Sequence, residues 1–174
     1  MNIFFTSDHH FYHNNIIEYC DRPFSSVGEM NSEMVSRWNS VVKQSDVVYH
    51  LGDFSLGNKE HIKEILDSLN GRIFFIQGNH DGNWITNPNI MSKTRIFLGD
   101  IKTVNVNSQK IVLCHYAMRS WDRSHYGVWH LYGHHHGNLA PHGLSFDVGV
   151  DTNNFYPYSF DEVKERINKL SIAD

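Results

Sequence analysis

Histidine, aspartate and asparagine recur in five short clusters along this chain of 174 residues, which has 13 histidines but only 15 lysines and arginines together. So many imidazole groups indicate a metal site or a proton-transfer site if their spacing is ordered, and scattered surface residues if it is not. Here each cluster directly follows a short apolar run. The clusters are Asp8-His9-His10, Gly52-Asp53, Gly78-Asn79-His80-Asp81, His115 and Gly133-His134-His135-His136.

These residue types favour a transition metal. Imidazole nitrogens mixed with carboxylate and amide oxygens suit Mn, Fe, Zn or Ni better than Mg or Ca, which prefer oxygen ligands throughout. Singly the clusters are weak evidence, since Gly52-Asp53 is an ordinary turn pattern and three consecutive histidines can form a solvated loop. Together they predict one metal-dependent site.

The apolar runs before the clusters have the pattern of buried strands. Residues 3–5, 47–51 and 73–76 are continuous and rich in β-branched or aromatic residues. Between them, apolar residues recur at helical spacing over 30–41 and 62–69, and the second helix has an N-cap in Asn58 and Gly71 after its end. This order predicts a β-α-β-α-β unit whose strands end at the edge where ligands of open α/β sheets bind.

The second half of the chain predicts further strands. Residues 101–106 and 110–114 flank Asn107-Ser108-Gln109 in the pattern of a hairpin, and 129–132 and 145–150 add two more strands. A last helix begins at Ser159, where Glu162 gives capping-box spacing. We expect a single domain over residues 1–174 with an α/β fold, in which two β-sheets pack face to face and are flanked by helices in four αββα layers.

Composition excludes several classes of protein. Hydrophobic residues make up 40% and charged residues 20%, as in folded globular proteins. No apolar run approaches the roughly 20 residues of a membrane helix, and the first eight residues lack the basic start of a signal peptide. A net charge of −4 makes a long nucleic acid a poor partner. Cys20 and Cys114 are expected as small buried residues of a reduced, cytoplasmic protein.

The series of clusters resembles the calcineurin-like metallophosphoesterase superfamily over residues 8–136, with every motif member present. The opening from Ser7 to Ile17, followed by Cys20-Asp21-Arg22-Pro23-Phe24, is similar to the small single-domain bacterial and phage branch. In that branch a proline is expected after His115-Tyr116, where this chain has Ala117. The resemblance implies the αββα sandwich of that family and a hydrolase of phosphate esters.

The resemblance also implies a role for each cluster residue. One divalent ion would be held by Asp8, His10, Asp53 and His136, and a second by Asp53, Asn79, His115 and His134, with Asp53 bridging. Manganese is the favoured metal, and iron, zinc or nickel are alternatives. A hydroxide that bridges the ions would attack the phosphate ester, while His80 serves the leaving group as general acid or charge stabiliser and Asp81 orients the His80 imidazole. The alternative for His80 is a structural hydrogen bond.

Six further residues are candidates for contacts to the substrate: His13, Asn15, Arg22, Arg119, Trp121 and Arg123. Guanidinium groups match phosphate oxygens and an indole can stack on a base, so the segment 119–123 favours a small, nucleotide-like phosphodiester over a long polymer. The alternative is that Trp121 packs in the core and the arginines are solvated. We expect His50 to be a buried core histidine. His13, His125 and His130 fit either a pocket or a structural role.

Two other functions compete with a phosphoesterase of small substrates. A catalytically inactive scaffold of the same fold usually lacks ligands or the catalytic histidine, and none is missing here. A nuclease on DNA or RNA would need a basic surface that the chain does not offer. The favoured reading is therefore a binuclear enzyme for a small phosphate ester, with no membrane partner; the sequence makes no prediction of the oligomeric state.

Overall fold

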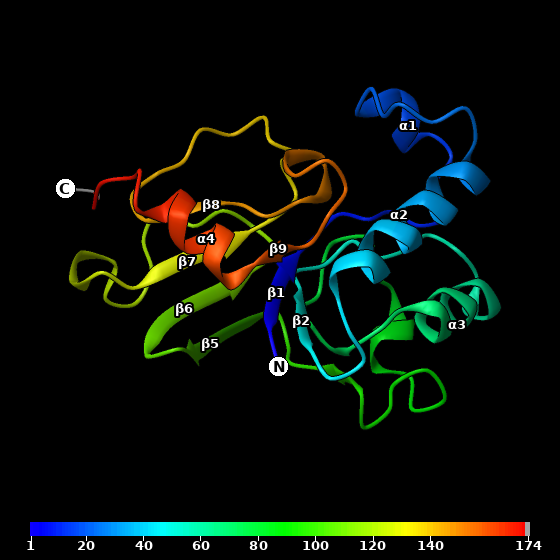
Figure 1. Ribbon diagram of the computed structural model, residues 1–174, viewed down its shortest axis with the longest axis horizontal. Helices are drawn as coiled ribbons and strands as arrows, with labels where there is room; N and C mark the ends of the chain where they lie inside the picture. Colours follow the sequence, from blue (N-terminus) through cyan, green and yellow to red (C-terminus); the bar gives the residue numbers. More distant parts are fainter. Residues whose placement is uncertain (173–174) are drawn as a thin grey trace.

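The computed structural model describes residues 1–172 as two β-sheets with helices packed against them (Figure 1). The first sheet has the strand order β4-β3-β2-β1-β9 and the second the order β5-β6-β7-β8. The strands are Ile3–Thr6 (β1), Val47–His50 (β2), Arg72–Phe75 (β3), Arg95–Phe97 (β4), Ile101–Val106 (β5), Gln109–Cys114 (β6), Trp129–Tyr132 (β7), Ser145–Asp147 (β8) and Tyr158–Ser159 (β9). The helices are Ile16–Tyr19 (α1), Val27–Val41 (α2), Lys59–Ser68 (α3) and Phe160–Ile167 (α4), with 3-10 turns at Asn83–Thr86 (η1), Ser124–Tyr126 (η2) and Val150–Thr152 (η3).

The first sheet contains the predicted β-α-β-α-β unit. β1, β2 and β3 run parallel, with Thr6 opposite His50 and His50 opposite Phe75, so their carboxyl ends lie side by side. α2 and α3 connect these strands and bury Trp38 and Leu66 in the core on one face of the sheet. As predicted, α3 begins at Asn58, whose side chain accepts the backbone N–H of His61.

The second sheet packs against the other face of the first. β5 and β6 form the expected antiparallel hairpin, and β6, β7 and β8 run parallel. Phe5 and Ile76 from the first sheet share a buried cluster with Leu113 and Leu131 from the second. α4 adds Val163 and Ile167 to this cluster, and the predicted capping box at Ser159 is present. The prediction of two packed sheets with flanking helices is confirmed.

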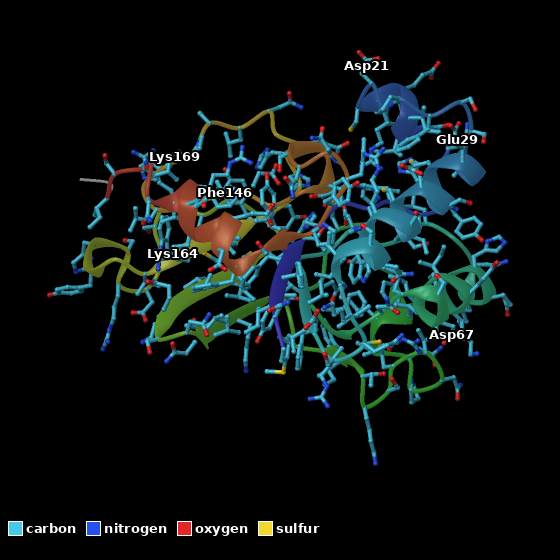
Figure 2. The ribbon with its side chains drawn as sticks, viewed as in Figure 1. Asp21, Glu29, Asp67, Phe146, Lys164 and Lys169 are labelled. Carbon is cyan, nitrogen blue, oxygen red and sulfur yellow. The ribbon has the colours of Figure 1, made fainter. Side chains whose placement is uncertain are left out.

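Three short elements, α1, β4 and β9, were not expected from the sequence because each has four residues or fewer. The strand expected over 145–150 stops at Asp147, because the Asp147 side chain accepts the backbone N–H of Gly149 and turns the chain into η3. The labelled charged residues, Asp21, Glu29, Asp67, Lys164 and Lys169, are exposed and lie around the outside of the molecule (Figure 2). Within residues 1–172, each helix is too short or too polar to span a membrane.

Candidate metal centre

The carboxyl ends of five strands bring the sequence clusters together. Two residues after β1 and one from the loop after β7 form a first group, in which one potential ligand atom from each lies within 4.8 Å of the others: Asp8, His10 and His136. A second group with the same property consists of Asp53, His115 and His134. We call these the first and second groups. Each group contains three of the four ligands in one of the two predicted sets. The missing members are Asp53 in the first group and Asn79 in the second.

Asp53 lies between the two groups. Its Oδ2 is 3.5 Å from His10 Nε2 on one side and 3.5 Å from His115 Nε2 on the other. The side-chain oxygen of Asn79 is 3.0 Å from the same nitrogen of His115. One carboxylate can therefore face two cations at once, as a bridging ligand does.

Two buried polar groups in the first group fit a cation. The Nε2 atom of His10 has no hydrogen-bond partner within the described residues, although the side chain is buried. A buried polar atom without a partner is costly, so an orphan at this place indicates a ligand. Burial also raises the pKa of Asp8 well above its usual range, and a carboxylate there needs a neighbouring cation to stay ionised. The donor set of imidazoles and carboxylates fits divalent transition metals.

The third member, His136, lies in a field that stabilises positive charge. Burial alone would lower the pKa of this imidazole, but a hydrogen bond with Asp151 and the nearby Asp8 raise it to about 10. The Nδ1 atom of His136 is 2.7 Å from Asp151 Oδ2. A proton or a metal ion can supply that charge.

The backbone at the site is unusual. Five of the seven predicted ligands have a left-handed φ: Asp8 (59°), His10 (52°), Asp53 (56°), His134 (71°) and His136 (49°). Such angles are uncommon for residues other than glycine and cluster at functional sites. The neighbouring glycines provide space, because a Cβ on Gly133 would collide with Asp8 and one on Gly78 with Asp53.

His80 and Asp81 lie at the second group, but their relation differs from the prediction. The Asp81 carboxylate accepts backbone N–H bonds from Asp53 (2.8 Å), Phe54 (2.9 Å) and Gly78 (2.9 Å). It therefore holds the loops that carry the ligands and does not orient the His80 imidazole. Burial raises the pKa of Asp81 to about 6.

The His80 imidazole is half-exposed beside the bridging carboxylate. Its Nε2 is 4.0 Å from Asp53 Oδ2, and its backbone N–H donates to Asp53 Oδ1 over 2.8 Å. The imidazole ring also lies 5.5 Å from that of His10, measured between centroids. A side chain so placed can reach a group bound at the bridging position and still exchange protons with solvent.

Two of the six candidate substrate residues, His13 and Arg119, stay available for contacts to a substrate. His13 Nδ1 is 3.3 Å from His10 Nδ1. Arg119 is exposed and lines a cavity of about 410 Å³ with Met118, Tyr132 and His142, between the loops that follow His115 and His136. A second, mostly apolar cavity of about 320 Å³ adjoins the second group at Asn79 and His115.

Two candidate contacts are corrected. Trp121 is buried, packs against Val112 and Val128, and donates its indole N–H to the backbone oxygen of Val128, so its ring faces cannot stack on a base. Arg22 is buried and bonded entirely to protein groups, so it offers no free donor to a substrate. Asn15 and Arg123 are exposed, on the N-terminal side of α1 and of η2 respectively, and stay predictions.

The remaining histidines and cysteines are placed as follows. His50 is buried and bonded through both ring nitrogens, to His9 and to the backbone N–H of Gly52, which confirms the prediction of a core histidine. His130 is also a structural residue, buried with both ring nitrogens bonded to backbone. Cys114 is buried as predicted, whereas Cys20 is half-buried, beside His136 and Asp151.

Sequence reasoning missed Asp151, which contacts the first group directly through His136. It also missed Asp147, whose carboxylate accepts the backbone N–H of Gly137 after the histidine run. Both residues follow or end a strand, β8, at the same edge as the other clusters. Their position at or after a strand end could have marked both aspartates as site residues. Neither has the histidine-rich neighbours that marked the other clusters.

The comparisons with known proteins identify the family and the fold. A sequence model of the calcineurin-like phosphoesterase superfamily domain matches residues 1–142, so the chain belongs to that superfamily. In general terms, the chain is therefore a metal-dependent phosphoesterase.

Relatives cover the chain widely. It is 38% identical to the uncharacterized protein MJ1445 of Methanocaldococcus jannaschii over 98% of this chain and 94% of that protein. The Gene 66 protein of Mycobacterium phage L5 is 36% identical over 47% of this chain and 40% of its own length. In fold, the crystal structure of the Aquifex aeolicus protein AQ665, of unknown function, has a TM-score of 0.73 at 23% identity and covers 95% of this chain and 98% of its own.

Proposed function

We propose that the chain is a binuclear phosphodiesterase that hydrolyses a small phosphodiester, acting as a single cytoplasmic domain. The observation that carries this proposal is the position of Asp53, whose Oδ2 lies 3.5 Å from a ring nitrogen of each group. The free thiols of Cys20 and Cys114 support a reducing compartment.

The proposed ligands are those of the two groups. Asp8, His10, Asp53 and His136 would hold one ion, and Asp53, Asn79, His115 and His134 the other. Manganese is our first choice, with iron, zinc or nickel as alternatives. When bound, such ions lower the pKa of water and attract the phosphate oxygens of an ester. The carboxylates of Asp8 and Asp53 neutralise only part of the charge of two divalent ions, so the site keeps an attraction for anions.

His80 is the proposed proton donor to the leaving oxygen. It is the half-exposed imidazole nearest the bridging carboxylate, at 4.0 Å, and exposure lets it regain a proton from solvent after each turnover. Asp81 acts indirectly, by fixing the backbone on both sides of Asp53 and at Gly78.

Arg119 is the proposed contact to the rest of the substrate. Its guanidinium group lines a cavity of about 410 Å³, a volume that suits a small molecule and not a polymer. The walls of this cavity come from the loops that follow two proposed ligands, His115 and His136. A small phosphodiester could therefore place its phosphate at the groups and its organic part against Arg119.

The test combines metal analysis with a substrate panel. Protein stripped with a chelator is loaded with Mn²⁺, Ni²⁺, Zn²⁺ or Mg²⁺ and assayed on phosphomonoesters, linear phosphodiesters and cyclic nucleotides. We expect two bound Mn²⁺ per chain and turnover of a small phosphodiester. One ion at most would overturn the binuclear site. Two ions without turnover of any ester would favour the inactive scaffold, and preference for long DNA or RNA would favour a nuclease.

A further inference from the structure

An ion pair between Arg22 and Asp151 is buried directly behind the first group. Arg22 lies between α1 and α2, and Asp151 lies in η3, 129 positions later in the chain. Nε and Nη2 of the arginine donate to the two carboxylate oxygens of Asp151, each over 2.8 Å. The arginine side chain has no exposed surface and the aspartate side chain is 10% exposed. Burying two charges is costly, so such a pair is weak evidence of a purely stabilising role.

The arginine also binds the turn that carries two proposed ligands. Its Nη2 donates to the backbone oxygen of Asp8 over 2.7 Å, and its Nη1 donates to that of His9 over 2.9 Å. The remaining donor points at the sulfur of Met30, 3.5 Å away. All five N–H groups of the guanidinium are thus in use. The carbonyls it holds belong to the stretch where Asp8 and His10 adopt left-handed φ angles.

The aspartate binds the third proposed ligand. Asp151 Oδ2 is 2.7 Å from His136 Nδ1 and is the same oxygen that accepts from Nη2 of Arg22. Because an ionised carboxylate only accepts hydrogen bonds, the proton of this pair is assigned to Nδ1 of the histidine. The lone pair of Nε2 is then free for a cation. This assignment fixes both the tautomer and the ring orientation.

We propose that Arg22 and Asp151 are positioning residues that set the metal affinity of the first group alone. Together they reach Asp8 through its backbone oxygen, His10 through the carbonyl of the peptide bond that precedes it, and His136 through its side chain. In the described residues, the second group has supports of its own: His115 Nδ1 bonds to the backbone oxygen of Leu51 over 2.8 Å, and Asp81 holds the backbone around Asp53. The groups touch where the backbone N–H of His134 donates to the Asp8 carboxylate over 2.9 Å. The inference rests on the proposed function, since it assumes that each group holds one ion.

The consequence is an asymmetric response to mutation. Removing a residue that orients a metal ligand typically weakens binding about 10- to 100-fold. Loss of the Asp151 carboxylate frees the His136 ring and leaves Arg22 with an unpaired buried charge that repels a cation. The first ion should therefore bind more weakly, while the second keeps its ligands and its supports.

The experiment is a titration of chelator-stripped protein with Mn²⁺, followed by calorimetry, on wild type, Asp151→Asn and a matched control. The control is Asp67→Asn, which weakens an Arg–Asp pair of similar length (2.9 Å, Arg95 to Asp67) on the surface, away from both groups. We expect Asp151→Asn to weaken one of the two binding events about 10- to 100-fold and to leave the other within about twofold. Asp67→Asn should change neither.

Two results would overturn the proposal: both affinities unchanged while the melting temperature of the metal-free protein falls, or both affinities weakened equally. If Asp151→Asn does not fold, Arg22→Lys is titrated instead, with the same selective loss expected. The wild-type titration separates this inference from the proposed function. Two ions without phosphodiester hydrolysis refute the function and leave the titration decisive for positioning, whereas wild-type protein that binds fewer than two ions refutes both.

Discussion

The two groups of the metal centre differ in their surroundings: a buried ion pair lies next to the first, and a cavity adjoins the second. In the first group, Asp8 and His10 are buried, and a buried ion pair backs them. In the second, Asp53 and His115 are equally buried, but Asn79, whose side-chain oxygen lies 3.0 Å from His115 Nε2, is exposed. A cavity of about 320 Å³ opens there, at Asn79 and His115. We call the first group the closed side of the metal centre, because its ligands are backed by the buried ion pair. We call the second group the open side, because a substrate can approach it through the cavity.

Replacing Asp53 should have the largest effect, because it is the one residue common to both sides. Asp53→Ala is expected to lose both ions and to reduce turnover of a small phosphodiester to background. Metal content after dialysis against micromolar Mn²⁺ is the measurement. His115→Ala, which removes a ligand from one side, should retain one ion. An Asp53→Ala protein that keeps one ion at wild-type affinity would break the comparison, since Asp53 would then belong to a single side.

Replacing His80, which is half-exposed beside Asp53, should affect the chemistry without removing an ion from either group. His80→Ala is expected to bind two ions, to fold normally and to lose about 10²–10⁴-fold in kcat, the usual contribution of a positioned acid. The loss should be greater for an alkyl phosphodiester than for an activated aryl one, because a poorer leaving group needs more help from an acid. The exposed His125, replaced by alanine, is the control. Equal rates for wild type and His80→Ala on both substrates would contradict the role.

Replacing Arg119 tests whether the substrate site extends from the open side into the cavity that Arg119 lines. Arg119→Ala should lower kcat/KM for a small phosphodiester about tenfold, as expected for one charge-assisted hydrogen bond to phosphate at a partly solvated site. Bound metal should stay at two ions. Arg72→Ala is the matched control and should behave as wild type. Arg72 is the exposed first residue of β3, at the end of that strand opposite the one that leads to the proposed ligands. If Arg119→Ala leaves the kinetics of every substrate in the panel unchanged, the cavity of about 410 Å³ is not a substrate site.

The smallest effect is a pH dependence at His130, which belongs to neither group. Burial lowers the pKa of His130 to about 4 in the folded chain. Its Nε2 accepts the backbone N–H of Met118 over 3.1 Å, on the wall of the larger cavity. The unfolded chain, with an ordinary histidine pKa near 6.5, binds a proton that the folded chain excludes. His130 should therefore lower the free energy of unfolding as the pH drops from about 6.5 to 4, and its own contribution is about 2 kcal/mol between pH 8 and pH 5.

Urea unfolding of metal-free wild type and His130→Gln at pH 8 and pH 5 measures this term. His130→Gln is less stable at pH 8 because it disturbs a buried hydrogen-bonded site, but it should lose less on acidification. The gap between the two proteins should thus narrow at pH 5. A gap of constant size would show that other groups carry the acid sensitivity.

The sequence predicts those parts of the molecule that short-range sequence patterns specify. The strand ends, the Asn58 cap and the Ser159 capping box follow from spacing alone, and so does the meeting of the clusters, since parallel strands end at a common edge. Arg22 and Trp121 show the limit. An arginine in the loop after the first cluster is taken for an anion contact until its partner, 129 positions away, is known. Trp121 is covered by Val112 from β6 and by Val128, the residue before β7. Its position in the sequence alone does not show that these residues bury it.

Asp81 shows the same limit at short range. Its position next to His80 favours a side-chain contact, yet its two oxygens accept three backbone N–H groups from two separate loops. Local sequence spacing cannot show which of several donors a carboxylate will reach once the loops pack together.

The proposed ligands come from both sheets: β1, β2 and β3 lead to Asp8, His10, Asp53 and Asn79, and β6 and β7 lead to His115, His134 and His136. Ions bound there would tie the two sheets together at one edge, as a crosslink does. A ligand that binds only the assembled state adds RT ln(1 + [L]/Kd) to its stability, about 2.7 kcal/mol at a hundred times Kd. Metal supply would then govern more than catalysis. It would set how often the sheets part and, with that, how long the protein survives proteases.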